Sequence, residues 1–242
     1  MAILVTGGAG YIGSHTCVEL INAGKDIVVI DNYYNSKPEA LRRVERITGT
    51  KVKFYECDIR DRAGLDKVFG ENNIDVVIHF AGLKAVGESC KIPLSYYDNN
   101  VAGTVTLCQA MADHGCKKLI FPQSVYDVNY LFGSPIPIPE DSESANPVVG
   151  DHSVYVICKN AAINIIEYYH RKYDIQNIIL RLPGVYHYHP KPYILIDGKM
   201  RVKSERILIQ KAIRGETLEI WGDPHRVLES VCMEDFLQIV HK

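Results

Sequence analysis

The feature that most constrains this chain is a glycine-rich segment, TGGAGYIG, at residues 6–13. It follows an apolar run at residues 3–5 and precedes a helical pattern that begins at Tyr11. A glycine turn between a strand and a helix is the context in which such a motif binds a dinucleotide. The free N–H groups of the first helical turn, at Tyr11 and Ile12, would then face the phosphates.

Each glycine in this turn has a predicted task, and a carboxylate follows at the expected distance. Gly7 would permit the tight turn, Gly10 would let the backbone approach a pyrophosphate, and Gly13 would let the helix pack closely on the strand. A second apolar run ends in Asp31. A carboxylate there can bind both ribose hydroxyls of NAD and would repel the 2′-phosphate of NADP. The segment therefore predicts binding of NAD.

Strand-like and helix-like segments alternate along most of the chain. Strands that are apolar throughout and separated by helices indicate a parallel sheet covered on both faces, so we predict an α/β fold with a doubly wound parallel sheet. Ligands of such sheets bind at the carboxyl ends of the strands. The later strands are expected at residues 52–56, 76–80, 118–121 and 177–181, and the later helices at residues 38–47, 62–69, 93–114 and 153–173.

Composition excludes several classes of function. The chain has 242 residues and a formal net charge of −2, which gives no electrostatic argument for nucleic acid or anionic membranes as partners. No apolar run approaches the roughly 20 residues of a membrane span. Met1 leads directly into the first strand, so we expect no signal peptide. The seven cysteines form no CxxC pair, which favours a cytoplasmic protein without disulfides or structural zinc.

Tyr155 and Lys159 stand four residues apart in a helical segment, so they share one face of the helix. A free phenol has a pKa near ~10, too high for a base at neutral pH. An ammonium group beside it, together with the positive charge of a nicotinamide, favours the phenolate and makes it a usable base. Ser124, at the end of a predicted strand, could hydrogen-bond the same substrate oxygen. We predict these three residues to be catalytic.

Several longer stretches resemble one family. The first 120 residues are similar to the extended short-chain dehydrogenase/reductases, and within that family to the UDP-glucose 4-epimerases. The resemblance implies a nucleotide-sugar epimerase that uses NAD, in which a tyrosine phenolate removes a hydroxyl proton while NAD takes the hydride from the same carbon. The matching stretches are TGGAGYIGSH (6–15), DN (31–32), CDIRD (57–61), HFAGLKAVGES (79–89) and YYDNNVAGT (96–104).

The resemblance also implies a set of site residues. The expected cofactor-binding residues are Gly7, Gly10, Tyr11, Ile12, Gly13, Asp31, Asn32, Asn35, Asp58, Ile59, Phe80, Ala81, Gly82, Lys84, Asn99, Tyr155 and Lys159. The expected substrate-binding residues are Lys84, Ser124 and Arg226. Because relatives pair through the helices expected at residues 93–114 and 153–173, the resemblance also implies a homodimer.

The second half departs from the family pattern. The segment near Asn146 lacks the family's tyrosine, which is why the catalytic pair is assigned to Tyr155 and Lys159. Gly184 occupies the position of an asparagine that binds the substrate diphosphate. Arg226 stands two positions before the family's phosphate-binding arginine, and it either replaces that arginine or only caps the turn after residues 223–224. We therefore expect an NAD-binding domain at residues 1–181 and a partial substrate-binding lobe at residues 182–242 that includes returning elements of the sheet and lacks the family's further continuation.

Two alternative functions remain open. One is a sugar-nucleotide reductase or dehydrogenase of the same fold, and the other is a non-catalytic NAD-binding protein. A dehydratase is less favoured, because its relatives carry an acid pair where residues 125–126 are Val and Tyr. His79 is expected in the core. His187 and His189 have no carboxylate partner at metal spacing, so no metal site is predicted.

Overall fold

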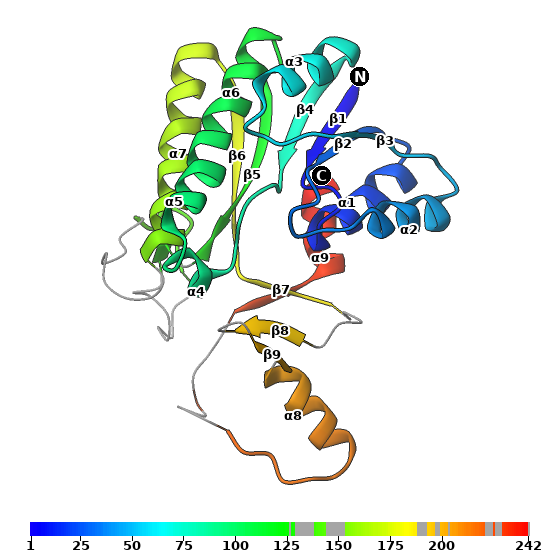
Figure 1. Cartoon of the computed structure of the whole chain (residues 1–242), viewed down its shortest axis with the longest axis vertical. Coiled ribbons are helices and arrows are strands. Elements are labelled where there is room, and N and C mark those ends of the chain that lie inside the picture. Colours follow the sequence, from blue (N-terminus) through cyan, green and yellow to red (C-terminus); the bar gives the residue numbers. More distant parts are fainter. Residues whose placement is uncertain are drawn as a thin grey trace.

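The computed structural model describes residues 1–125, 127–128, 138–143, 153–187, 193–196, 199–202, 204–220, 225 and 229–241. Its centre is a six-stranded parallel sheet with strand order β3-β2-β1-β4-β5-β6 (Figure 1). This confirms the predicted doubly wound α/β fold. The first three strands are added toward one edge of the sheet and the next three toward the other, so the switch point lies between β1 and β4. The strands are β1 (Ala2–Thr6), β2 (Asp26–Asp31), β3 (Lys53–Glu56), β4 (Ile74–His79), β5 (Lys118–Ser124) and β6 (Gln176–Leu182).

Helices cover both faces of the sheet, as the apolar strands require (Figure 1). Helices α3, α6 and α7 lie on one face, and α1 and α2 lie on the other, together with a helix from the end of the chain. The helices up to β6 are α1 (Tyr11–Asn22), α2 (Pro38–Thr48), α3 (Arg62–Glu71), α4 (Val86–Ser89), α5 (Pro93–Tyr96), the π-helical segment η1 (Tyr97–Ala102), α6 (Gly103–Asp113) and α7 (Ser153–Tyr173).

Side chains of the central strands alternate between two cores, because successive residues of a strand point to opposite faces. In β1, Leu4 packs under α3 and α6, whereas Val5 packs under α1 and α2. In β4, Val77 likewise packs in the core under α3 and α6, and Ile78 packs in the core under α1 and α2. His79 is buried as expected, and its Nδ1 lies 2.8 Å from the Thr6 Oγ1.

The segment predicted as one helix over residues 93–114 contains a π turn. Between α5 and α6, residues 97–102 form η1. Asn100, within this turn, hydrogen-bonds both backbone groups of Leu83: its Oδ1 accepts from the N–H and its Nδ2 donates to the carbonyl, each at 2.8 Å. Helical periodicity cannot reveal such a turn, because the apolar face continues through it. π turns are frequent at functional sites.

The part of the chain after β6 forms small elements that sequence periodicity does not predict. They are β7 (Gly184–Tyr186), β8 (Tyr193–Ile196), β9 (Lys199–Val202), α8 (Ser204–Ile213), β10 (Ser230–Cys232) and α9 (Met233–His241). β10 pairs in parallel with β7 rather than with the six-stranded sheet. It is α9 that returns to the sheet: Met233, Phe236 and Val240 are buried in the same core as α1 and α2. The domain boundary at residue 181 stays a prediction.

No helix in the described ranges is both long and apolar enough to span a bilayer.

Candidate active site

The turn between β1 and α1 brings backbone against backbone. Gly7 has a φ of +69°, which favours glycine, and its N–H donates to the Ile30 carbonyl at 2.8 Å. A Cβ on Gly7 would lie 2.7 Å from the Ala81 nitrogen, and one on Gly13 would lie 2.3 Å from the Gly7 carbonyl oxygen. A side chain at either position would therefore force the loop apart. Gly10 is less crowded, since a Cβ there would lie 3.0 Å from the Gly7 oxygen.

Asp31 connects the end of β2 to this glycine turn. Its buried carboxylate accepts three hydrogen bonds: from the Ala9 N–H at 3.0 Å, from the Tyr33 N–H at 2.9 Å and from the Ser36 hydroxyl at 2.7 Å. A carboxylate has about four lone-pair sites, so one acceptor position remains for a ribose hydroxyl. The glycine backbone and this carboxylate together form a cradle that fits a dinucleotide at the switch point of the sheet.

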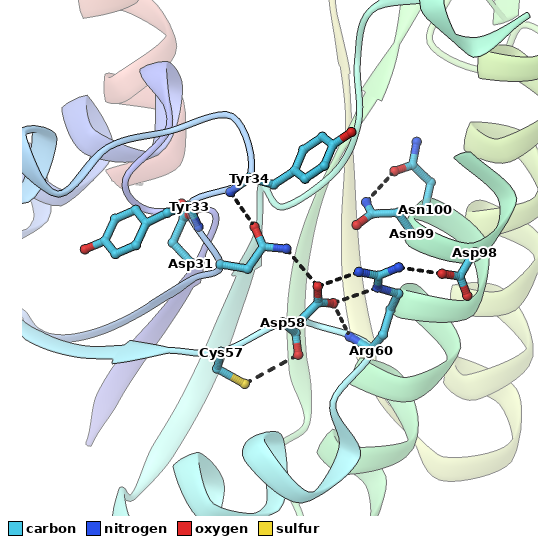
Figure 2. Close-up of polar contacts among 10 residues, drawn as sticks. Asp31, Tyr33, Tyr34, Cys57, Asp58, Arg60, Asp98, Asn99 and Asn100 are labelled. Atoms are coloured by element: carbon cyan, nitrogen blue, oxygen red, sulfur yellow. Dashed lines mark hydrogen bonds and ion pairs between the residues drawn. The ribbon is translucent and has the colours of Figure 1, made fainter. Parts of the chain in front are cut away.

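A charged network follows β3 (Figure 2). The Arg60 side chain lies between Asp58 and Asp98 and bonds both carboxylates. Asn32 Nδ2 also donates to Asp58, at 2.8 Å. Hydrogen bonds from Arg60 hold the pKa of Asp58 well below its usual range, although burial opposes this effect. Asp58 is therefore a stable anion at neutral pH.

The network links the loop after β2 to η1, because Asn32 and Asp98 lie at its two ends (Figure 2). Arg60 and Asp98 are absent from the predicted site. The signal that could have revealed Arg60 is its place two residues after Asp58 in the CDIRD stretch. Asn35, in the same loop as Asn32, is exposed.

Ile59, by contrast, is buried and packs against Gly103 at the start of α6. A Cβ on Gly103 would lie 2.6 Å from the Ile59 Cδ1. Ile59 therefore faces the core between β3 and α6, and Asp58 beside it points to the crevice network (Figure 2).

The residues after β4 extend along the same edge of the sheet. The Phe80 N–H donates to the Thr6 carbonyl at 3.1 Å, and the Ala81 N–H donates to the Thr6 hydroxyl at 3.1 Å. Gly82 is partly buried beside Asn100, whereas Lys84 is exposed. Asn99 donates to the Asn100 side chain at 2.9 Å (Figure 2). These predicted cofactor-binding residues therefore gather at the switch point.

Tyr155 and Lys159 share α7, as predicted, and their surroundings differ. Tyr155 is buried in a small cluster with Leu83 and Tyr96. The Lys159 Nζ donates to the Pro122 carbonyl at 2.8 Å and lies 4.5 Å from the centre of the Phe121 ring. Burial lowers the pKa of Lys159 to about 8. The helix thus presents Lys159 to β5 and Tyr155 to the residues that follow β4.

Ser124 ends β5, two residues beyond the carbonyl that holds Lys159, and pairs with Leu182 in the register of β5 and β6. The preceding Gln123 is buried, and its Nε2 donates to the Asn160 side chain at 3.0 Å. Because Asn160 directly follows Lys159, this hydrogen bond links β5 to α7 next to Lys159. The predicted substrate residue Arg226 and the segment around Asn146 lie outside the described residues, and so does His189.

This arrangement matches a known family. The family model for the NAD dependent epimerase/dehydratase family covers residues 3–242. The chain belongs to this family. Its sequence is 60% identical to the UDP-glucose 4-epimerase of Bacillus subtilis over 143 residues, which are 58% of this chain and 41% of that protein. It is 37% identical to UDP-glucose 4-epimerase 2 of Arabidopsis thaliana over 247 residues, which are 99% of this chain and 68% of that protein.

Solved structures of family members share the fold. The UDP-glucose-4-epimerase of Stenotrophomonas maltophila, with bound NAD and formylated UDP-arabinopyranose, matches all of this chain with a TM-score of 0.84 and 32% identity. The UDP-glucose 4-epimerase of Bifidobacterium longum, in complex with NAD+ and UDP, matches 98% of it with a TM-score of 0.79 and 36% identity. In each case this chain covers 72% of the solved chain. By contrast, it covers about two fifths of the first curated relatives, 41% and 42%.

Proposed function

We propose that this protein is an NAD-dependent epimerase that inverts C4 of a UDP-hexose. The observation that carries the proposal is the Tyr155–Lys159 pair on α7, with Lys159 bonded to the carbonyl two residues before Ser124. Support for placing this pair near the glycine turn comes from Tyr155, which packs against Leu83, two residues after the Ala81 backbone that closely approaches Gly7. Membership of the NAD dependent epimerase/dehydratase family supports the same chemistry.

The residues that would hold NAD come from the ends of β1, β2 and β3 and from α7. The N–H groups of the first turn of α1 would bind its pyrophosphate, and Asp31 would accept a bond from a ribose hydroxyl. The Asp58 side chain and the backbone of Ile59, whose side chain packs in the core, would flank the adenine, and Lys159 would bind the other ribose. An ammonium group has three donors, so the bond to Pro122 leaves two for this task. The chemistry that NAD would supply at this site is the reversible uptake of the C4 hydride.

Tyr155 would act as the base that removes the C4 hydroxyl proton. The positive charge of Lys159 would favour the phenolate, and the Ser124 hydroxyl would hydrogen-bond the sugar oxygen. When the hydride returns, the same phenol would give the proton back, so the reaction consumes no cofactor. Lys84 and Arg226 are the proposed further contacts with the substrate.

The first test is to denature the purified protein and identify the released small molecules by mass spectrometry. We expect close to one NAD per chain and a UDP-sugar with it. Turnover without net NADH formation would separate an epimerase from a dehydrogenase or reductase. An exchangeable cofactor that is consumed in each turnover would favour that second class instead.

The second test is Tyr155→Phe. Loss of a positioned acid–base group costs about 10²–10⁴-fold in rate. We therefore expect kcat to fall by that factor while the NAD content per chain stays unchanged. Unchanged turnover would contradict the catalytic assignment, and absence of both NAD and turnover in the wild type would favour a non-catalytic role.

We further infer that the protein forms a homodimer. We also infer that it works in a reducing compartment, the cytoplasm. Large apolar side chains are exposed on the helices that pair in relatives, among them Leu94, Val105 and Tyr168. None of the seven cysteines takes part in a disulfide. Sedimentation equilibrium would test the dimer, because a monomer at micromolar concentration would contradict it.

A further inference from the structure

A second cluster of reactive side chains lies where β7, β10 and α9 meet. Cys232, the last residue of β10, is opposite Tyr186 of β7, so His187 follows directly beside it. Glu234 stands in the first turn of α9. The ligand atoms of His187, Cys232 and Glu234 all lie within 4.8 Å of one another. Since β7 and β10 are far apart in the sequence, only the fold assembles this group.

The contacts within the cluster are direct. The His187 Nδ1 lies 3.0 Å from the Glu234 Oε1, and the Cys232 thiol donates to the other oxygen of the same carboxylate. Glu234 is thus the carboxylate partner that the sequence did not reveal for His187. Both side chains of the pair are substantially exposed, so solvent screens their attraction. The inclusion of a thiol distinguishes the cluster from an ordinary surface ion pair.

An imidazole nitrogen, a thiolate and a carboxylate are the donor types that Zn²⁺ combines in proteins. Zn²⁺ binds these atoms at about 2.0–2.3 Å in tetrahedral geometry, which separates neighbouring ligand atoms by roughly 3.2–3.8 Å. The three ligand atoms here all lie within 4.8 Å of one another, so the side chains would have to adjust to reach that spacing when the ion binds. Three protein ligands leave the fourth position to a water molecule.

We propose that His187, Cys232 and Glu234 bind a zinc ion that fastens the end of β7 to the junction of β10 and α9. The thiol proton is released to solvent when the metal binds. The ion would hold α9 in place against the core that it shares with α1. Nearby, the rings of His187 and His15 are 5.5 Å apart, and the His15 Nδ1 lies 2.8 Å from the Tyr11 carbonyl. The site therefore adjoins the start of α1, outside the proposed catalytic group.

The proposal is tested with the full chain after chelation and dialysis, titrated with Zn²⁺ alone by calorimetry. We expect one ion per chain, and at least a 10-fold loss of affinity in both Cys232→Ser and His187→Asn. Cys90→Ser is the matched control, because Cys90 is an exposed cysteine on a different part of the fold. Equal zinc affinity in the wild type and in Cys232→Ser, or no binding at micromolar Zn²⁺, would overturn the proposal.

A second measurement on the wild type does not depend on whether the variants fold. Alkylation of single cysteines, followed by peptide mapping, reports which thiol the metal protects. Zn²⁺ should slow the alkylation of Cys232 at least 10-fold and leave that of Cys90 unchanged. Co²⁺ in place of Zn²⁺ should give a thiolate charge-transfer band in the near ultraviolet. Protection of Cys90 rather than Cys232, or the absence of that band, would refute the site.

Discussion

The crowding at Gly13 makes a quantitative prediction about the substitution Gly13→Ala. The added methyl group would lie 2.3 Å from the Gly7 oxygen and 2.8 Å from the Gly8 Cα. Both neighbours are backbone atoms of the turn, so no side chain can move aside and α1 must shift from the turn. Overpacking of this kind costs typically 1–3 kcal/mol, and we expect the upper end, about 3 kcal/mol.

For a chain of this size, about 1 kcal/mol corresponds to roughly 2–4 °C in Tm. Gly13→Ala should therefore lower Tm by about 6–12 °C and should also weaken NAD binding, since the first turn of α1 moves. Differential scanning calorimetry and isothermal titration with NAD measure the two effects. The control is Gly70→Ala in α3, where nothing lies within 4 Å of the new methyl group. Alanine should stabilise that helix by about 0.5 kcal/mol.

The two substitutions are expected to change the stability in opposite directions, and this contrast tests the reasoning. If Gly13→Ala melts within about 1 °C of the wild type and binds NAD equally well, the backbone contact at the turn does not limit this position. If both variants are destabilised alike, the loss would reflect a general intolerance of glycine replacement and not the geometry at Gly13.

Three further predictions follow from buried charged or titratable groups. Burial lowers the pKa of His79 to about 3, whereas the unfolded residue protonates near 6.5. Protons therefore favour the unfolded chain as pH falls from about 6.5 toward 3, and stability should drop by up to ~1.4 kcal/mol per pH unit from this group. Urea unfolding of wild type and His79→Gln at several pH values should show that the variant lacks this part of the slope. Arg181→Met leaves the buried carboxylate of Asp127 without the ion pair at 3.1 Å, and should cost about 3 kcal/mol in urea unfolding; a loss below ~0.5 kcal/mol would contradict the pairing. Because the pKa of Lys159 is lowered to about 8, kcat should decline as pH rises through that value and the ammonium loses its charge; a profile flat to pH 10 would exclude this role.

The main sheet could be predicted from the sequence because its strands are buried on both faces. Runs such as residues 27–30 and 76–78 are apolar throughout, and the helices between them are long enough to show their period. The glycine turn was equally readable, since a positive φ at Gly7 and the close approach at Gly13 leave little choice of residue.

The rest depends on contacts between distant residues. β7 and β10 have three residues each, too few for a recognisable alternation, and they exist as strands because they pair with each other. The same pairing places His187 beside Cys232 and Glu234. Arg60 bonds both Asp58 and Asp98 across the crevice, and no local sequence pattern predicts its bond to the distant Asp98.

The return of α9 to the first half of the fold has a consequence for synthesis on the ribosome. Met233, Phe236 and Val240 complete a core whose other walls, β1, β2 and α1, leave the exit tunnel much earlier. Until residues 233–240 emerge, the part of this core that α9 covers stays exposed, although α2 already packs on the rest. Contacts with such large sequence separation form slowly, so the nascent chain is open to aggregation or chaperone binding throughout this interval. A nascent chain stalled before residue 233 should accordingly bind a holdase chaperone more strongly than one that has released α9.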